Sequence, residues 1–463
     1  MQEPISGADP RDHLERSLTL LDATMLVVAS VIGAGIFFTP GRVAELLPHP
    51  GWIMAAWIVG GLVSLVGALA NAELGAMFPR AGGDYVYLRE GVHPLAGFLV
   101  GWFSFFGIYA GTIAALAAAF AAALASRLGL GDDAILPLAI GVTLLLSLVN
   151  FLGVRWGALA NNLTSLVKLG ALLAFAILGP LVGEGDLTRL FAASADARDT
   201  ASWPSLAAFG MAMSPVLFSY LGWNASVYVA SEIREPGRNL PRSLFLGLFL
   251  CSGIYLLVNG VYLFALPLET LRGVPDAGEA AARALFGGLG GRLLGAFVML
   301  SVLGTLNAMV LVGPRIVYAM ALDGLFFRGA DRVSAAYRTP GIAIAVQALL
   351  SVLLLVLLRS FPSALDFTTF AIVLASMADV VALFRLRRLQ PERERPYRAW
   401  GYPLLPALYF VANAAVAVAL LVGRPYECGI SLALLALGLP FYVLFARRKG
   451  PGGATPGGNS SVM

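Results

Sequence analysis

The chain has 463 residues, of which 59% are hydrophobic and only 13% are charged, and its mean hydropathy is +0.82. A water-soluble domain cannot bury so large an apolar fraction, so we expect a protein that crosses a membrane many times. The net charge of +4 requires no nucleic-acid partner, because the basic loops of a membrane protein account for it.

Twelve apolar segments, each long enough to cross the hydrocarbon core of a bilayer, follow one another along the chain. We expect spans at residues 20–47, 52–78, 94–126, 134–152, 160–183, 206–231, 241–267, 290–321, 340–358, 363–384, 403–422 and 428–446. Together they form one transmembrane domain, 20–446, between a polar N-terminal segment, 1–19, and a tail, 447–463, that is expected to be disordered.

Basic residues predict the orientation of these spans. With both termini on the inner side, the inner loops hold more arginine and lysine than the outer loops do. An even number of spans agrees with two termini on the same side. The sequence therefore predicts a multi-pass protein of the cell membrane, plasma or inner, with both termini in the cytoplasm.

The first span is weakened at its centre. The stretch VASVIGAGIFFTP, from Val28 to Pro40, contains Gly33 and Gly35, and each glycine costs about 1 kcal/mol of helix stability relative to alanine. Small residues in a membrane helix commonly form a packing surface for a neighbouring helix. The other interpretation is that the helix opens here, because unpaired backbone groups persist in a membrane only where they line a cavity or meet a ligand.

The fifth span contains a cation, Lys168. A charge at the centre of a span costs roughly 2.5–3.5 kcal/mol or more, so such a residue is a functional candidate. Lys168 and Lys449 are the only lysines of an arginine-rich chain, and lysine can lose its proton when desolvated whereas arginine cannot. The alternative is that the side chain of Lys168 snorkels to the inner surface.

The sixth span repeats the pattern of the first. Pro215 and Gly222 flank Ser219 and Tyr220, so a second helix is broken near its middle. If spans 1–5 and spans 6–10 are two copies of one unit, the five crossings make the second copy inverted, and spans 11 and 12 are additional. Paired breaks in inverted halves predict a transporter site at mid-membrane, where free N–H and C=O groups bind the carboxylate and the ammonium of an amino acid.

Enzymatic chemistry is not indicated. The histidines lie apart in loops and at helix ends, and Cys251 and Cys428 fall inside predicted spans. This pattern offers no metal-ligand cluster, no Ser-His-Asp set and no disulfide framework, so we expect neither catalysis nor a cofactor.

VIGAGIF at 31–37 and FSYLGWN at 218–224 resemble the amino acid–polyamine–organocation superfamily, above all its L-type amino acid transporter branch and the bacterial relatives of that branch. Further similar stretches are residues 72–102, 234–244, 307–326 and 395–410. The resemblance covers most of the chain. It implies an all-α polytopic membrane protein with twelve transmembrane helices and a LeuT-like inverted five-helix repeat in which helices 1 and 6 are broken.

The resemblance also implies a substrate site. Backbone N–H groups would meet the substrate carboxylate, backbone carbonyls would meet its ammonium, and one aromatic side chain would cover the bound molecule. The N–H groups belong to Gly33, Ala34 and Gly35, the carbonyls to Val31, Ile32, Phe218, Ser219 and Leu221, and the aromatic cover is Phe218. Ala34 departs from the serine common in the family and Leu221 from its glycine, and the leucine disfavours bulky substrates.

For Lys168 the resemblance implies that the ammonium occupies the place where sodium-coupled relatives hold an ion, between the broken part of span 1 and span 8. Ser301 and Thr305 are its candidate partners, because residues four apart share one face of a helix. The implied carrier is independent of sodium, and protons are the other candidate coupling ion.

We therefore expect a secondary active transporter that moves neutral L-amino acids by alternating access, through exchange or proton coupling. An amino acid sensor without net flux and a carrier of cationic amino acids are the alternatives, and the second is disfavoured because no acid lies beside either break. The expected partners are the amino acid, the lipid bilayer and, for proton coupling, protons. The sequence leaves the oligomeric state open.

Other charges of the spans are expected near span ends. Glu73 and Asp379 fall near cytoplasmic ends and Asp366 near an outer end, where solvated or gating roles are favoured. Glu232 and Arg234, at the inner end of the sixth span, are candidates for an ion-pair gate.

Overall fold

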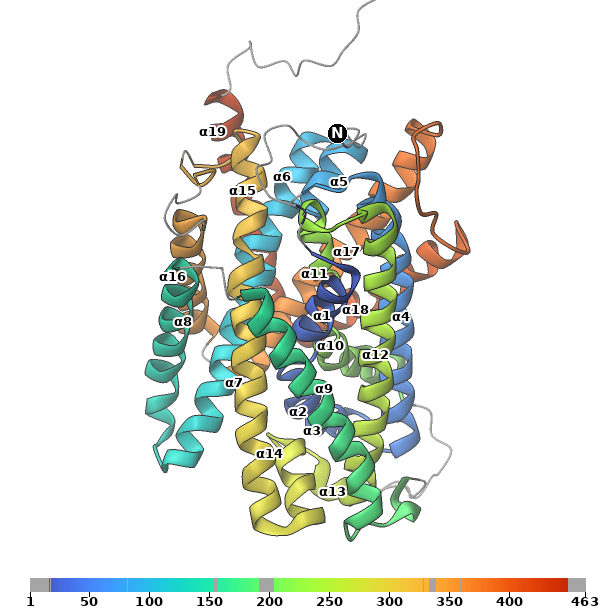
Figure 1. The fold of residues 1–463 in the computed structure, drawn as a ribbon, viewed down its shortest axis with the longest axis vertical. Helices are drawn as coiled ribbons and strands as arrows, with labels where there is room; N and C mark the ends of the chain where they lie inside the picture. Colours follow the sequence, from blue (N-terminus) through green and yellow to red (C-terminus); the bar gives the residue numbers. More distant parts are fainter. Residues whose placement is uncertain are drawn as a thin grey trace, which may run out of the picture.

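The computed structural model describes residues 16, 18–80, 82–152, 157–190, 204–327, 329–332, 339–358 and 360–448. The regular structure of this part is helical, and one isolated parallel bridge joins Leu18 to Ile233. The predicted segments 1–19 and 447–463 lie almost wholly outside the described residues. Figure 1 shows one elongated bundle; we call the end where the chain begins the N-terminal end and the other, near α3 and α13, the far end.

The helices follow one another in chain order. The first half contains α1 (Leu20–Val31), α2 (Gly35–Phe38), α3 (Pro40–Leu46), α4 (Pro50–Met77), α5 (Asp84–Gly91), α6 (Pro94–Phe103), the π-helix η1 (Ser104–Tyr109), α7 (Ala110–Leu128), η2 (Asp132–Ala134), α8 (Ile135–Leu152), α9 (Gly157–Val182) and η3 (Leu187–Leu190). The second half contains α10 (Leu206–Ser219), α11 (Ala225–Tyr228), η4 (Ala230–Glu232), α12 (Pro236–Ala265), α13 (Leu268–Leu271), α14 (Ala277–Val312), α15 (Pro314–Leu322), α16 (Gly341–Leu358), α17 (Phe361–Leu389), α18 (Leu404–Gly423) and α19 (Pro425–Arg448).

Among the described residues, 11 helical stretches are long and apolar enough to cross a membrane. The sixth predicted span is not one of them, because α10 has only 14 residues and ends at an irregular turn. The eighth predicted span, 290–321, starts too late: α14 begins at Ala277 and runs on through a kink at Gly287, whose φ is 73°. Glycines that interrupt the apolar pattern there bend the helix without ending it.

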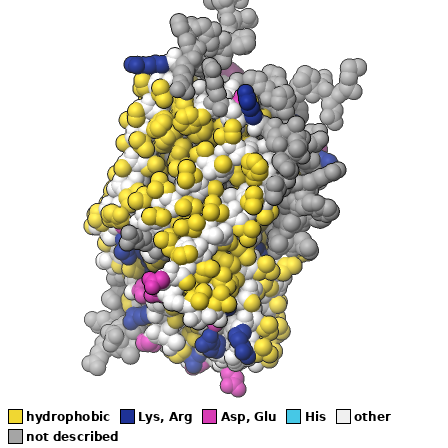
Figure 2. Space-filling model, turned by 90° about the vertical axis from the view of Figure 1, so that its left-hand side faces the viewer, with side chains coloured by type: hydrophobic (Ala, Val, Ile, Leu, Met, Phe, Trp, Pro, Cys, Tyr) yellow, Lys and Arg dark blue, Asp and Glu magenta, His cyan; other side chains and the backbone are white. Residues whose placement is uncertain are grey.

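The outside of the bundle is apolar between its ends. In Figure 2 hydrophobic side chains cover most of the height of the face shown, whereas charged side chains lie mainly toward its two ends. Large exposed apolar side chains include Leu145 and Leu148 on α8 and Leu349 and Leu353 on α16. A surface of this kind matches the hydrocarbon layer of a bilayer, so the chain is a multi-pass membrane protein.

The first helix lies inside the bundle rather than at its edge. α1 packs against α9, α12 and α14, and α11 reaches it from the N-terminal end (Figure 1). Its entry is fixed by a capping box, in which Asp22 Oδ2 accepts the N–H of Thr19 at 2.9 Å and Thr19 Oγ1 accepts the N–H of Asp22. This packing places the glycine-rich end of α1 in the middle of the protein.

Candidate functional site

The first break separates α1 from α2. Ile32 leaves the helical conformation, with φ −76° and ψ 88°, and α2 starts only at Gly35. A Cβ on Gly33 would lie 2.9 Å from Cγ2 of Thr305, and a Cβ on Gly35 would lie 2.5 Å from Cα of Ser219. The close approach of α14 and α10 therefore requires both glycines. The two interpretations offered for these glycines, helix packing and an open backbone, thus both apply here.

The second break separates α10 from α11. α10 ends at Ser219, and Gly222 has a φ of 98°, which glycine adopts without strain. A Cβ on Gly222 would lie 2.7 Å from Cβ of Ser30, so this turn rests directly on α1. The hydroxyls of Ser219 and Thr39 are 2.9 Å apart. The two breaks thus face each other across a hydrogen-bond distance.

Free backbone donors and helix-end carbonyls meet between the breaks. The N–H groups of Gly33, Ala34 and Gly35 have no hydrogen-bond acceptor among the described residues. They precede α2, and N–H groups at a helix start attract negative charge. The carbonyls of Val31 and Ser219 end α1 and α10, where helical carbonyls lose their partners within the helix.

Tyr255 on α12 joins the two helix ends. Its hydroxyl oxygen lies 2.7 Å from the carbonyl oxygen of Val31 and 2.8 Å from that of Ser219. A hydroxyl donates only one hydrogen, so one of the two carbonyls always lacks this donor. Tyr255 is not among the site residues predicted from the sequence. A useful signal was available, because a tyrosine in the middle of a membrane span must place its hydroxyl on a partner.

Lys168 is buried, with 2% of its side chain exposed, and does not snorkel to a surface. Its Nζ donates to the carbonyl oxygen of Ile32 at 3.0 Å and to Oγ1 of Thr305 at 2.9 Å. Thr305 Oγ1 in turn lies 3.2 Å from the carbonyl oxygen of Ala29. The lysine therefore ties α9 to the first break and to α14. Among the described residues it has no carboxylate partner.

The two predicted partners of Lys168 differ. Thr305 makes the hydrogen bond just described, whereas the hydroxyl of Ser301 is buried and has no partner among the described residues. The carbonyl oxygen of Ser301 lies 3.3 Å from Thr305 Oγ1, one turn further along α14. Ser301 shares the face with Thr305, but its hydroxyl makes no hydrogen bond in the network of Lys168.

Aromatic side chains separate the breaks from a cavity at the far end. The ring of Phe361 lies 5.8 Å from that of Phe218 and 6.0 Å from that of Phe38, edge to face in both pairs. A cavity of about 960 Å³ is lined by Phe38, Phe361 and Thr39. Leu221, half-buried, donates its N–H to the carbonyl of Phe218 at 3.0 Å. Phe218 thus lies between the second break and Phe361, which lines this cavity.

Polar contacts close the N-terminal end. Arg315 Nε lies 3.0 Å from Glu232 Oε1, and Arg89 forms an ion pair with Asp323. The N–H of Arg234 donates to the carbonyl of Leu18 at 2.8 Å, which holds the start of the chain against η4. Glu232, predicted as part of an ion-pair gate, therefore pairs with α15, and Arg234 contributes its backbone to the same closure.

The remaining acids of the spans are buried rather than solvated. Glu73 Oε2 lies 2.6 Å from Arg387 Nη2 and accepts the N–H of Ala399 at 2.7 Å. Asp366 Oδ2 lies 3.2 Å from Arg424 Nε, and its Oδ1 accepts the hydroxyl of Ser214 at 2.7 Å. The solvated role that the sequence favoured does not hold for these groups, because helix packing covers them and supplies partners.

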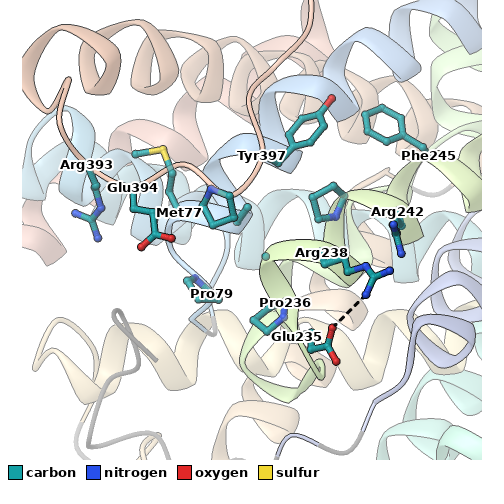
Figure 3. A pocket seen from close by; sticks show the side chains of 14 residues that line it. Met77, Pro79, Glu235, Pro236, Arg238, Arg242, Phe245, Arg393, Glu394 and Tyr397 are labelled. Atoms are coloured by element: carbon teal, nitrogen blue, oxygen red, sulfur yellow. Dashed lines mark ion pairs between the residues drawn. The ribbon is translucent and has the colours of Figure 1, made fainter. Parts of the chain in front are cut away.

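A second pocket, of about 830 Å³, opens at the N-terminal end, away from the breaks (Figure 3). It lies between the end of α4, the start of α12 and residues 393–397. Arg238 and Glu235 form an exposed ion pair at 3.8 Å on one side of it, and the Tyr397 ring lies near Phe245 on the other. No residue of either helix break lines this pocket, so it is not the candidate site.

Comparison with known proteins places these features in context. The amino acid permease family matches residues 18–431. The serine/threonine exchanger SteT of Bacillus subtilis is 30% identical over 440 residues, which cover 94% of this chain and 98% of the relative. The large neutral amino acids transporter small subunit 2 of Oryctolagus cuniculus is 30% identical, covering 93% and 80%, and the human Asc-type amino acid transporter 1 is 27% identical, covering 95% and 84%.

Proposed function

The chain belongs to the amino acid permease family, and on this premise we propose that it carries small neutral L-amino acids across a membrane by sodium-independent exchange. Its similarity to transporters named for serine, threonine and large neutral amino acids supports the substrate class. The observation that carries the proposal is the pair of facing helix breaks, which presents unpaired N–H groups opposite carbonyls that lack a full set of donors.

An amino acid backbone fits these groups chemically. We assign its carboxylate to the N–H groups of Gly33, Ala34 and Gly35, where the start of α2 attracts negative charge. Its ammonium goes to carbonyls at the two breaks, because a carbonyl oxygen has two lone pairs and can accept a further hydrogen bond. These are the carbonyls of Val31, Ile32, Phe218, Ser219 and Leu221. Phe218 covers the bound molecule and packs against Phe361 of the far-end cavity.

The residues around the two breaks favour a substrate whose side chain is small and neutral. No acidic residue forms a hydrogen bond or an ion pair with the described residues of the two breaks, so the ammonium of a lysine-like substrate has no second partner there. Leu221 is bulkier than glycine, and Gly35 already lies against Ser219. These features support serine-sized substrates over cationic ones.

Lys168 takes the role of a fixed link in this proposal. Its amine binds the carbonyl of Ile32 and the hydroxyl of Thr305, as a bound cation in the same place would. The site therefore needs no sodium ion. Proton coupling through this amine is the competing possibility, and it would require the link to break in each cycle.

We also propose the transmembrane topology that the sequence predicts. The 11 long apolar stretches and the broken helix α10–α11 give twelve spans, with spans 1–5 and 6–10 as inverted repeats, 11 and 12 as additions, and residues 20–446 as the permease domain. The N-terminal end, closed in this structure, faces the cytoplasm of the cell membrane. The far-end cavity faces outward.

Exchange is tested with purified protein in liposomes. Uptake of labelled L-serine, L-alanine, L-leucine and L-lysine is measured with and without unlabelled L-serine inside, with and without sodium, and with and without an inward proton gradient. We expect serine and alanine uptake only into vesicles loaded with serine, unchanged by sodium.

Each of the other outcomes would indicate a different activity. Uptake into empty vesicles driven by the proton gradient alone would replace exchange by proton symport. Serine binding without flux under any condition would favour a sensor, and preference for lysine would make this a carrier of cationic amino acids.

A further inference from the structure

The pocket at the N-terminal end is lined by two kinds of side chain. Three arginines and two glutamates line it, so the charge of its lining is positive, +1. The other lining residues are apolar or aromatic and include four prolines. No residue of either helix break is among them. An occupant that complements both parts of this lining carries an anionic group and an apolar group.

Two of the arginines are available for an anion. Arg242 is exposed and forms no ion pair with a described residue, and Arg238 pairs with Glu235 at 3.8 Å, where both side chains are more than 60% exposed. An exposed pair of this kind contributes little to stability, so a bound anion can replace the glutamate. Positions 238 and 242 are four apart on α12 and share one face of the helix, on one side of the pocket (Figure 3). One phosphate group can accept hydrogen bonds from both guanidinium groups.

The opposite wall of the pocket is held in place by aromatic contacts. The guanidinium carbon of Arg393 lies 4.0 Å from the centre of the Phe78 ring. The rings of Phe245 and Tyr397 are 5.8 Å apart, so the segment that follows α17 packs against α12. These contacts fix the shape of the pocket before any ligand binds, which lowers the entropic cost of binding.

The apolar part of the pocket continues along the outside of α12. Phe245 lines the pocket, and Phe249, four residues further, is 71% exposed, with Leu246 and Leu250 exposed beside it. Arg242, Phe245 and Phe249 share a face of the helix, and seven residues of helix separate the arginine from Phe249 by about 10 Å. Along α12 the charged groups thus precede the apolar ones, as the phosphate precedes the acyl chains in a phospholipid.

The pocket lies at the depth where lipid headgroups are expected. α4 ends and α12 begins at this pocket, and the first large exposed apolar side chain of α12 is Leu246. Trp400, three residues beyond Tyr397, is 76% exposed, and tryptophan is enriched at the interface between membrane and water. The arginines therefore lie between the aqueous phase and the hydrocarbon layer.

We propose that this pocket binds an anionic glycerophospholipid, with its phosphate between Arg238 and Arg242 and an acyl chain against Phe245 and Phe249. Basic pockets between helices at a membrane surface bind the headgroups of such lipids. A free phosphate would leave the apolar part of the lining without a partner. The site is separate from the helix breaks, and the inference depends neither on the transported substrate nor on which end faces the cytoplasm.

The test measures lipid binding to the purified, delipidated full chain in detergent. Phosphatidylglycerol or phosphatidylcholine is added in increasing amounts, and native mass spectrometry counts the molecules that the protein retains. Thermal unfolding is followed on the same samples, because a ligand that binds the folded state raises the Tm. Glycerol 3-phosphate and inorganic phosphate serve as soluble probes that lack acyl chains.

The variant Arg238→Gln/Arg242→Gln removes two positive charges and keeps long polar side chains. The matched control is Arg332→Gln/Arg398→Gln, which removes the same charge from two exposed arginines that do not line the pocket. We expect the parent and the control to bind phosphatidylglycerol equally, within a factor of about two. The pocket variant should bind it about tenfold more weakly or worse, because charge-assisted hydrogen bonds to the phosphate are lost.

The acyl chain is tested separately. Phe249→Ala shortens an exposed side chain outside the arginine pair, so we expect phosphatidylglycerol to bind about threefold more weakly or worse, because apolar contact area is lost. The parent should also bind phosphatidylglycerol more tightly than phosphatidylcholine, whose headgroup carries no net charge. Size-exclusion chromatography verifies folding. If the double variant aggregates, Arg242→Gln alone is measured, since Arg242 has no described ion-pair partner.

Three results would overturn the proposal. The first is equal binding of the two lipids by the parent, and the second is equal loss of binding in the pocket variant and in the matched control. The third is stabilisation by glycerol 3-phosphate or inorganic phosphate that equals the effect of phosphatidylglycerol, which would make the pocket a site for a soluble anion. Serine exchange has no part in these measurements, so its absence would leave the lipid site intact.

Discussion

The hydroxyl of Tyr255 is a single donor that lies within hydrogen-bond distance of two helix-end carbonyls. It lies between the carbonyl that ends α1 and the carbonyl that ends α10, so it couples the first break to the second. An unsatisfied carbonyl in an apolar interior costs roughly 1–3 kcal/mol. In the proposed function, an ammonium bound here would supply the donor that the tyrosine cannot supply to both carbonyls at once.

Replacement of Tyr255 by phenylalanine removes this donor and preserves the ring. We expect serine exchange to fall by about tenfold or more, because 1.4 kcal/mol corresponds to a factor of about ten. The matched control is Tyr262→Phe on the same helix, since the hydroxyl of Tyr262 is buried without a partner among the described residues. Initial exchange rates in liposomes compare the two. Equal loss in both variants would show that the effect is not specific to the carbonyl bridge.

Lys168 likewise depends on one of two similar hydroxyls. Thr305→Val keeps the shape of the side chain and removes the acceptor of the lysine, so we expect exchange to decrease strongly. Ser301→Ala removes a hydroxyl that has no described partner, and we expect activity within a factor of about two of the parent, since such a change has little free-energy cost. Both variants are compared by exchange rate and by thermal unfolding in detergent. Loss of exchange in Ser301→Ala would contradict the assignment.

At the scale of elements, the important feature is that two helices stop where they touch. α1 ends against the turn at Gly222, and α2 begins against Ser219 at the end of α10. The two breaks fit together, because the turn at Gly222 packs against Ser30 of α1 and Gly35 of α2 packs against Ser219 of α10. The glycines therefore combine close contact with open backbone.

The contact predicts different outcomes for two glycine-to-alanine substitutions. Gly35→Ala places a methyl group 2.5 Å from Cα of Ser219, which is backbone and cannot turn aside, so we expect exchange to be lost. Gly170→Ala, on α9, meets no atom within 4 Å and should leave exchange intact and stabilise the helix by up to about 1 kcal/mol. Size-exclusion chromatography and exchange rates separate a folding defect from a transport defect. Normal exchange by Gly35→Ala would remove the first break from the substrate site.

At the scale of the whole molecule, the two ends differ. A cavity of about 960 Å³ leads from the far end to Thr39, whose hydroxyl contacts Ser219, whereas ion pairs and backbone hydrogen bonds cover the N-terminal end. The pocket of the N-terminal end includes no residue of the breaks, whereas the far-end cavity extends to Thr39 beside them. This asymmetry is the arrangement that alternating access requires.

The ion pair between Glu232 and Arg315 tests this asymmetry. Each side chain is less than 20% exposed, so removal of one leaves the other partly buried without its partner. We expect Glu232→Arg and Arg315→Glu each to slow exchange and to increase labelling, by a water-soluble thiol reagent, of a cysteine that replaces the buried Ser231 on η4. The double variant, which restores a pair of opposite charges, should recover a large part of both. Additive effects in the double variant would show that the pair does not close this end.

Local pattern explains which features the sequence could predict. The length of each apolar run is set by the bilayer, and glycine and proline break helices locally, so the spans and the breaks near Gly33 and Gly222 are readable from the chain. Lys168 stood out because a charge in a span is costly. The permease family predicted from these motifs is confirmed by the match over residues 18–431.

Partners across the bundle are not local, so spacing along the chain cannot distinguish among them. Ser301 and Thr305 are equivalent in spacing, and only the packing of α9 on α14 brings Thr305 to the lysine. Glu73 and Asp366 were expected near solvent because they lie toward span ends, yet arginines distant in the chain cover both.

By itself, then, the sequence determined that this chain crosses a membrane repeatedly and opens two helices at mid-span, since hydropathy and helix propensity act between near neighbours. The tertiary structure decided which groups meet: Tyr255 with two carbonyls, and Lys168 with Thr305. The physical reason is that hydrogen bonds depend on distances of about 3 Å between residues far apart in the chain, which only the packing of helices sets.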